Sequence, residues 1–262
     1  MNETGSVEYA CRDLTVTLPG RYGARDVLGA VDIDIQRGSI TTLVGRSGVG
    51  KTTLLRVLAG FTVASAGALE HRGSLVKGPL ADVVTVFQDY THALLPWRSV
   101  TRNIMLGLEA QRLSRQERDS RVAGALEMVG LTDYATEYPW RLSGGMQQRV
   151  QIARAVAVRP KVLLMDEPFG ALDSMTKANL QDQLIDVRNS TGCTIVFITH
   201  DVEEAVYLAD KVVVIDGQPG TITKAVDVGL PFPRDQVTTR EMPRFLEVRH
   251  DLYAALRGQT HD

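Results

Sequence analysis

The feature that most constrains the fold is an eight-residue run, GRSGVGKT, at residues 45–52. It matches the G-x-x-x-x-G-K-[ST] pattern of a phosphate-binding loop. The apolar run at residues 40–44 predicts a buried strand before it, and residues 53–59 predict a helix after it. Glycines let backbone N–H groups approach a phosphate, and a helix N-terminus adds free donors and partial positive charge. The sequence therefore predicts an α/β domain that binds a nucleotide at this turn.

Two side chains of the loop have distinct predicted roles. Lys51 can reach the outer phosphates as a point charge. The Thr52 hydroxyl can complete the ligand shell of Mg²⁺. The other candidate phosphate contacts are Gly45, Ser47, Gly48, Gly50 and Thr53.

A second candidate anion site lies at residues 142–149, LSGGMQQR, where Ser143, Gly144 and Gly145 open an apparent helix. It would consist of a hydroxyl, bare N–H groups and a helix dipole. One chain rarely needs two such sites for one phosphate tail. Two copies of the chain, packed head to tail, would instead place this site over the partner's phosphate-binding loop. An ordinary helix with Ser143 as its N-cap is the alternative.

Two acids end the apolar run at residues 162–165. Acids at the carboxyl end of a parallel strand face the ligand crevice. Asp166 would hold Mg²⁺ directly or through water, whereas Glu167 points differently and can take another role. Solvated acids at a strand end are the alternative.

His200 closes a third apolar run at residues 194–198. It could be a core residue, a metal ligand or a phosphate contact, and the absence of a second His or Cys at metal spacing argues against a metal. The remaining histidines lack such a context and are interpreted as surface residues: His71, His92, His250 and His261.

Composition excludes several classes of protein. The 262 residues, 44% hydrophobic and 23% charged, suit one large domain or a domain with an inserted subdomain. A net charge of −2 argues against a protein that tracks along nucleic acid. The apolar runs are strand-sized, the N-terminus does not read as a signal peptide, and two isolated cysteines form no disulfide framework. We expect a reduced, cytoplasmic protein.

Hydrophobic patterns predict the remaining organisation. Alternation over residues 7–36 indicates antiparallel strands, and continuous apolar runs near Leu43, Leu163 and Phe197 indicate a parallel sheet covered on both faces. Amphipathic helices are expected at residues 110–130, in an inserted helical subdomain, and at 180–187. A final helix is expected at 245–256, and we expect no sizeable regulatory domain after it.

The order of these motifs resembles that of the ATP-binding cassette (ABC) ATPases, over residues 9 to about 215, with LSGGMQQR as the family signature. The resemblance implies a RecA-like P-loop core with an N-terminal antiparallel β-subdomain and an inserted α-helical subdomain. We assign the core to residues 1–88 and 151–262, and the inserted subdomain to residues 89–150. The implied ligands are ATP and Mg²⁺, bound between two copies of the chain in a head-to-tail ATP-sandwich dimer.

The resemblance also assigns individual roles. Glu167 polarises the attacking water, and His200 contacts the γ-phosphate and orients Glu167. Gln88, which ends the apolar run at 83–87, ligates Mg²⁺ and senses the water. Asp173 belongs to the D-loop, GALD at 170–173, which contacts the opposite subunit. Tyr22 would stack on adenine, with a loop aromatic packed on the small sheet as the alternative.

Further details indicate the kind of ABC protein. The chain carries no fused membrane helices and a single cassette, and the 55 residues from Gln88 to Ser143 are too few for a coiled-coil insertion. Residues 89–100 and 168–173 resemble the nitrate/sulfonate/taurine-type importer ATPases. This implies a peripheral subunit on the cytoplasmic face of the inner membrane, with integral permease subunits and a periplasmic or extracellular solute-binding protein. An exporter or lipoprotein-release ATPase, or an ABC ATPase acting on nucleic acid or the ribosome, stays an alternative function.

The apolar segment at residues 94–97 follows Gln88, and Pro96 disfavours a continuous helix through it. Exposed apolar clusters often mark contact sites, and Trp is a frequent interface anchor. In the family this region receives a short helix of the permease, so we predict that Trp97 contacts the permease. Packing of Trp97 beneath the helical subdomain is the alternative.

Overall fold

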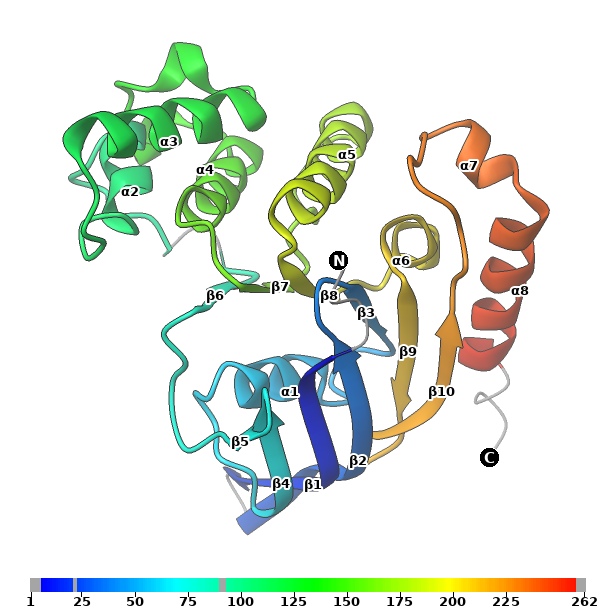
Figure 1. Cartoon of the computed structure of the whole chain (residues 1–262). Helices are drawn as coiled ribbons and strands as arrows, with labels where there is room; N and C mark the ends of the chain where they lie inside the picture. The colour runs from blue at the N-terminus through cyan, green and yellow to red at the C-terminus, as the bar shows by residue number, and fades with distance from the viewer. Residues whose placement is uncertain (1–5, 21–22, 90–92, 258–262) are drawn as a thin grey trace.

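The computed structural model describes residues 6–20, 23–89 and 93–257, which form two β-sheets and the helices around them (Figure 1). The strands are β1 (Val7–Gly20), β2 (Gly23–Gln36), β3 (Ile40–Val44), β4 (Ala66–His71), β5 (Ser74–Leu75), β6 (Val83–Val86), β7 (Val162–Asp166), β8 (Thr194–Ile198), β9 (Lys211–Asp216) and β10 (Thr221–Asp227). The helices are α1 (Lys51–Leu58), α2 (Val100–Leu106), α3 (Arg115–Met128), α4 (Gly144–Ala157), α5 (Ser174–Thr191), α6 (Val202–Leu208), α7 (Thr238–Glu241) and α8 (Pro243–Arg257), with 3₁₀ turns at Thr132–Tyr134 and Pro139–Arg141.

The larger sheet has the order β10-β9-β3-β8-β7-β6. Its strands are parallel except for β10, which runs antiparallel to β9. Both faces are buried: in β8, Ile195 and Phe197 pack into one hydrophobic cluster while Val196 and Ile198 pack into the other. The prediction of a parallel sheet covered on both faces is confirmed, because a strand buried on both sides needs an unbroken apolar run.

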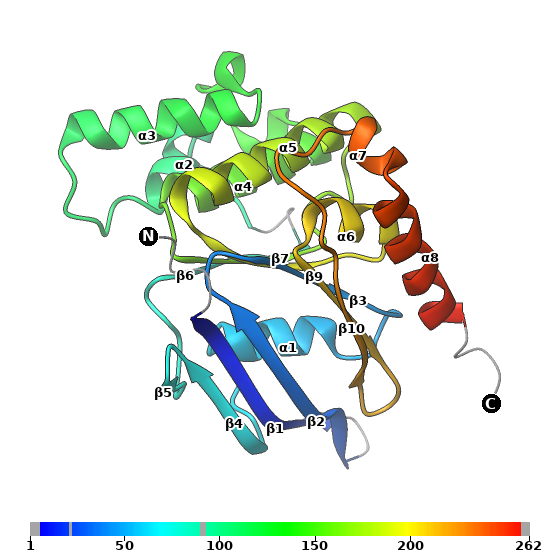
Figure 2. The same ribbon diagram turned by 45° about the vertical axis from the view of Figure 1, so that its right-hand side comes forward.

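The smaller sheet, with the order β2-β1-β4-β5, is antiparallel. It confirms the strands expected from the alternation over residues 7–36. Figure 2 shows α1 between this sheet and the larger one, on the side opposite to α5 and α6. The α1 helix and the inner residues of β1 and β2 share one hydrophobic cluster with the lower face of the larger sheet.

The helices α2, α3 and α4 lie together at one end of the molecule (Figure 1). The helix expected at 110–130 is α3, which begins only at Arg115 because the Ser114 hydroxyl caps it by accepting a hydrogen bond from the Glu117 N–H. The helix expected at 180–187 is the much longer α5. Asp173 caps the start of α5, and Gly192, in the left-handed region with φ 67°, ends it.

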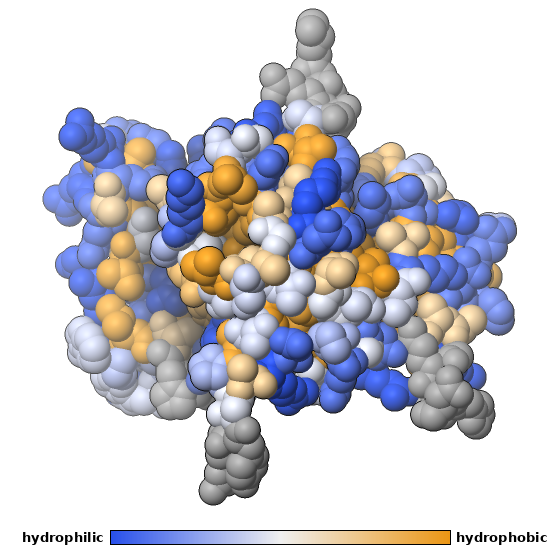
Figure 3. Space-filling model, turned by 90° about the horizontal axis from the view of Figure 1, so that it is seen from below, coloured by the Kyte–Doolittle hydropathy of each residue, from blue (hydrophilic) through white to orange (hydrophobic). Residues whose placement is uncertain are grey.

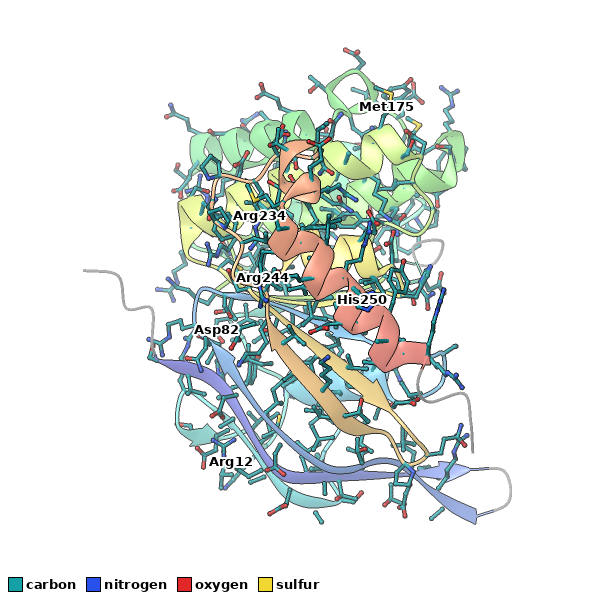
Figure 4. The ribbon with its side chains drawn as sticks, turned by 90° about the vertical axis from the view of Figure 1, so that its right-hand side faces the viewer. Arg12, Asp82, Met175, Arg234, Arg244 and His250 are labelled. Carbon is teal, nitrogen blue, oxygen red and sulfur yellow. The ribbon has the colours of Figure 1, made fainter. Side chains whose placement is uncertain are left out.

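The interpretation of His71 as a surface residue is wrong. Its side chain is buried, and its Nε2 lies 2.8 Å from Oε1 of the fully buried Glu8. Pairing of β4 with β1 places His71 beside Tyr9 and so inside the small sheet's packing. His250 is exposed on the outer side of α8 (Figure 4), as expected, whereas His92 and His261 lie outside the described residues.

The chain after β10 folds back against the core, and the predicted last helix is confirmed as α8. Arg234, between β10 and α7 (Figure 4), is buried and donates hydrogen bonds to the Tyr207 and Ala209 carbonyl oxygens, at 2.6 and 3.0 Å. The Phe232 ring lies under its guanidinium group, with 4.2 Å from Cζ to the ring centroid. These contacts fasten the segment after β10 to the end of α6.

Seen from the side of the small sheet, the surface carries hydrophobic patches separated by hydrophilic side chains (Figure 3). Within residues 6–20, 23–89 and 93–257, no helix combines the length and the apolar character needed to span a bilayer.

Candidate active site

The loop between β3 and α1 has the geometry of a phosphate cradle. Gly50 is the N-cap of α1, with φ 100°, a left-handed conformation that favours glycine. A Cβ on Gly50 would lie 2.6 Å from Leu28 Cδ2, and one on Gly45 would lie 2.1 Å from the Ile215 carbonyl oxygen. Any other residue at these two positions would displace the backbone of β9 at Ile215 or the side chain of Leu28 in β2.

Lys51 lies folded into this loop. Its Nζ donates hydrogen bonds to the carbonyl oxygens of Gly45, at 2.8 Å, and Arg46, at 2.7 Å. The side chain is buried, and burial lowers the pKa of its ammonium group, although the nearby charges of Glu167 and Asp166 act in the opposite direction. From this position the ammonium group can donate charge-assisted hydrogen bonds to phosphate oxygens in the loop.

Thr52 and Asp166 come together from different elements. The Thr52 hydroxyl, in the first turn of α1, donates to Asp166 Oδ2 at the end of β7, over 2.7 Å. Burial raises the pKa of the Asp166 carboxyl group, and the hydrogen bond from Thr52 partly offsets it. A hydroxyl and a carboxylate side by side at the phosphate loop are hard oxygen donors, which fit Mg²⁺.

Glu167 is held between the side chains of Gln88 and His200. Gln88 Nε2 donates to Glu167 Oε2 over 3.0 Å, and His200 Nδ1 lies 3.4 Å from Glu167 Oε1. Glu167 has φ 46°, the left-handed region that non-glycine residues rarely adopt. This backbone conformation is strained, so it persists only because the surrounding contacts hold it in place.

A pocket of about 430 Å³ gathers these groups. It is lined by Val27, Gly45, Ser47, Gly48, Gly50, Lys51, Thr52, Thr53, Gln88, Asp166, Glu167 and His200. A larger cavity of about 660 Å³ lies between α3 and α5, away from the phosphate loop. We assign the site to the smaller pocket because the phosphate loop, the carboxylates and the histidine converge there.

Two of the sequence-predicted groups lie outside this pocket. Ser143 is the exposed N-cap of α4, with its hydroxyl accepting from the Met146 N–H at 3.3 Å, and Gly144 and Gly145 follow it. Asp173 is the exposed N-cap of α5, and hydrogen bonds led by that from the Thr176 N–H lower the pKa of its carboxyl group. Tyr22 lies outside the described residues.

Sequence reasoning missed two residues near the site. Val27, in β2, lines the pocket. Gln148, in α4, is buried and hydrogen-bonds to the backbone of Glu167. Gln148 stands inside the LSGGMQQR run, but nothing in that pattern indicates which of its two glutamines points inward.

A family model described as "ABC transporter" matches residues 28–170, which is more than half of the chain. The chain belongs to the ABC transporter family. It is an ATP-binding protein whose ATPase activity is coupled to transport, on an α/β fold with a RecA-like P-loop core.

Curated relatives match almost the whole chain. The nitrate import ATP-binding protein NrtD of Synechocystis sp. is 42% identical over 252 residues, which cover 94% of each chain. The aliphatic sulfonates import ATP-binding protein SsuB 1 of Xanthomonas axonopodis pv. citri is 44% identical over 239 residues, which cover 91% of this chain and 93% of that one.

Solved structures agree with the fold. The dimeric structure of a post-hydrolysis state of the ATP-binding cassette MJ0796, bound to ADP and Pi, has a TM-score of 0.75 to this chain. It is 27% identical in sequence and covers 84% of this chain and 98% of its own.

Proposed function

We propose that this chain is the ATP-hydrolysing subunit of an ABC importer that takes up a small anionic or polar solute, of the nitrate, sulfonate or taurine kind, through separate permease subunits. Two observations support the proposal: the pocket that joins the phosphate loop to Glu167 and His200, and the nitrate and sulfonate import proteins among its relatives. The chain would bind peripherally at the cytoplasmic face of the membrane and work with a solute-binding protein outside it.

The proposal gives roles to the polar residues of the pocket and to Tyr22, which lies outside the described residues. The loop N–H groups and the Lys51 ammonium group hold the phosphates, and Tyr22 stacks on the adenine. Thr52, Asp166 and Gln88 would hold Mg²⁺, which supplies charge neutralisation on the phosphate oxygens. Glu167 orients the attacking water and accepts its proton, while His200, 3.4 Å from the Glu167 carboxylate, keeps that carboxylate in place and contacts the γ-phosphate.

A second copy of the chain would complete the site. Ser143 and Asp173 cap the starts of α4 and α5, and both are exposed outside the pocket of their own chain. In a head-to-tail dimer, Ser143, Gly144 and Gly145 would reach the γ-phosphate held by the partner's loop. The inserted subdomain proposed at residues 89–150 would carry this signature, although α4 continues across residue 150 to Ala157.

Glu167→Gln tests the site. The amide keeps the shape of the side chain but cannot accept a proton, so we expect ATP binding to persist while turnover falls by orders of magnitude. Saturating MgATP should then hold the variant as a dimer, measured by light scattering after gel filtration. Glu127→Gln, an exposed carboxylate on α3, is the matched control and should hydrolyse ATP at the parent rate.

Two outcomes would contradict this assignment. One is native turnover by Glu167→Gln, and the other is a variant that stays monomeric with MgATP bound. Adding Ser143→Arg to Glu167→Gln should abolish the dimer if Ser143 faces the partner's phosphates.

The direction of transport needs a separate test with the permeases. Cells that express the chain with its permeases and solute-binding protein should accumulate labelled nitrate, alkanesulfonate or taurine, and the Glu167→Gln variant should not. Loss of an internal substrate instead would favour an exporter or a lipoprotein-release system. Activity stimulated by nucleic acid or ribosomes, with no effect of permeases, would favour a non-transport ABC ATPase.

A further inference from the structure

Side chains of α4 contact the backbone of the segments that carry Gln88 and Glu167, two residues of the catalytic pocket. Gly145, Gln148, Gln151 and Arg154 follow one another at intervals of three residues, so they form a row that winds gradually around the helix along its length. The same helix begins at the exposed Ser143. A single helix therefore joins the signature residue Ser143 to the backbone groups that these side chains contact.

Gln148 contacts the loop between β7 and α5 at two points. Its Nε2 donates to the Glu167 carbonyl oxygen over 3.3 Å, and its Oε1 accepts from the Ala171 N–H over 3.1 Å. The side chain is 2% exposed. One buried amide thus spans the segment from Glu167 to the D-loop.

The hydrogen bonds of Gln148 act on Glu167, whose backbone is strained. Glu167 has φ 46°, and its N–H donates to the Ile198 carbonyl oxygen over 3.0 Å. A glutamate in the left-handed region persists only where neighbouring contacts fix it. With the bond from Gln148, both the N–H and the carbonyl of Glu167 are held.

Other residues of the row reinforce the contact. A Cβ on Gly145 would lie 3.0 Å from the Ala171 carbonyl oxygen, so α4 approaches the D-loop closely. Gln151 Nε2 donates over 3.1 Å to the carbonyl oxygen of Phe87, the residue before Gln88. Arg154 donates over 2.8 Å to the Ala93 carbonyl oxygen, beyond Gln88.

We propose that Gln148 is a positioning residue that fixes the backbone of Glu167 and so aims the Glu167 carboxylate, and that through it α4 couples the engagement of Ser143 to the catalytic geometry of the same chain. Because a helix moves as a unit, a shift of Ser143 onto a partner's nucleotide also shifts Gln148, five residues along α4. The inference rests on the proposed role of Glu167 as the group that orients the attacking water.

Gln148→Met tests the inference, since methionine fills a similar volume without forming either hydrogen bond. Nucleotide binding depends on the phosphate loop, so we expect KM for ATP to change by less than about twofold while kcat falls by about tenfold to a hundredfold, as for a misplaced catalytic group. Gln111→Met is the matched control: it removes an amide that donates to the Val158 carbonyl oxygen, at the other end of α4, over 3.1 Å. Its kcat should equal that of the parent.

Thermal melts establish that each variant is folded. If Gln148→Met does not fold, Gln148→Asn decides the question, since its amide is one methylene too short to span both partners and should lower kcat equally. An unchanged kcat in the folded variant, or equal losses in Gln148→Met and Gln111→Met, would overturn the inference.

The Glu167→Gln background separates this inference from the proposed function. If Gln148 acts through Glu167, adding Gln148→Met to Glu167→Gln should not reduce the residual turnover further. A multiplicative further loss would overturn the positioning role while leaving the role of Glu167 intact. Native turnover by Glu167→Gln alone would instead overturn the proposed function.

Discussion

Lys51→Ala removes an ammonium group that lies 2.7 and 2.8 Å from two carbonyl oxygens of the phosphate loop. The ammonium group is held in a mostly buried position, and burial lowers its pKa. A phosphate in the loop would add negative charge near the ammonium group, beside that of Glu167 and Asp166. Each charge-assisted hydrogen bond contributes roughly 1.5–3 kcal/mol.

The net loss of binding free energy is smaller than the sum of two such bonds, because Lys51 gives up part of its contact with the two carbonyl oxygens when it turns to phosphate. We therefore expect a loss of about 2–4 kcal/mol, which is roughly a 30- to 700-fold rise in the dissociation constant for ATP. Titration calorimetry measures this change directly.

Lys224→Ala is a suitable control, since this lysine is half-buried on β10 and is paired with Asp251. Its ATP affinity should match that of the parent. A folded Lys51→Ala variant whose affinity stays within about threefold of the parent would refute the reasoning, because no charge-assisted contact is worth so little at a buried site.

Three further results are expected. His200→Ala should lower turnover as Glu167→Gln does, and the double variant should be little worse than either single one; independent, multiplicative losses in steady-state kinetics would make His200 structural. Trp97 is 71% exposed, so Trp97→Ala should leave the melting temperature of the chain unchanged and weaken pull-down of co-expressed permease. A large drop in melting temperature with permease binding intact would contradict a contact role. Cys11 and Cys193 are buried, and burial raises the pKa of each thiol to about 12, so at pH 8 neither should react with a thiol reagent until the chain is unfolded; rapid labelling of the native protein would disprove this.

The sequence predicted the parts of the fold that depend on local pattern. Unbroken apolar runs located β3, β7 and β8, and the alternation over residues 7–36 located β1 and β2. Both signals follow directly from which faces of a strand are buried. The phosphate loop was equally readable, because its backbone geometry demands glycine at fixed positions.

Helix ends were harder to predict. Asp173 was interpreted only through its resemblance to the D-loop, so its second role as the N-cap of α5 was missed, and the expected helix was too short. The weak amphipathic pattern of α5 gave no signal beyond residues 180–187. Capping side chains must be read for structure even where they also belong to a functional motif.

Buried polar side chains were the main failure. His71 and Gln148 are buried because of partners far away in the sequence: Glu8, 63 positions away, and the loop at Glu167 and Ala171. Hydropathy ranks both residues as surface candidates, since burial of a polar group depends on tertiary hydrogen bonds that local sequence does not encode. The contact between Glu167 and His200 was expected from the family resemblance, whereas that between Glu167 and Gln88 becomes visible only when β6 and β7 are aligned.

The segment that follows β10 limits which parts of this chain can be exchanged with those of its relatives in a chimera. Phe232 lies under two guanidinium groups, those of Arg234 and of Arg188 in α5, and Arg188 also donates to the carbonyl oxygen of Gly38, two residues before β3. Because β3 leads into the phosphate loop, the segment after β10 is linked through Arg188 to the strand that carries this loop. A chimera that exchanges this segment between relatives must carry compatible residues at 188 and 207–209, or it will loosen the base of the nucleotide site while leaving every signature residue intact.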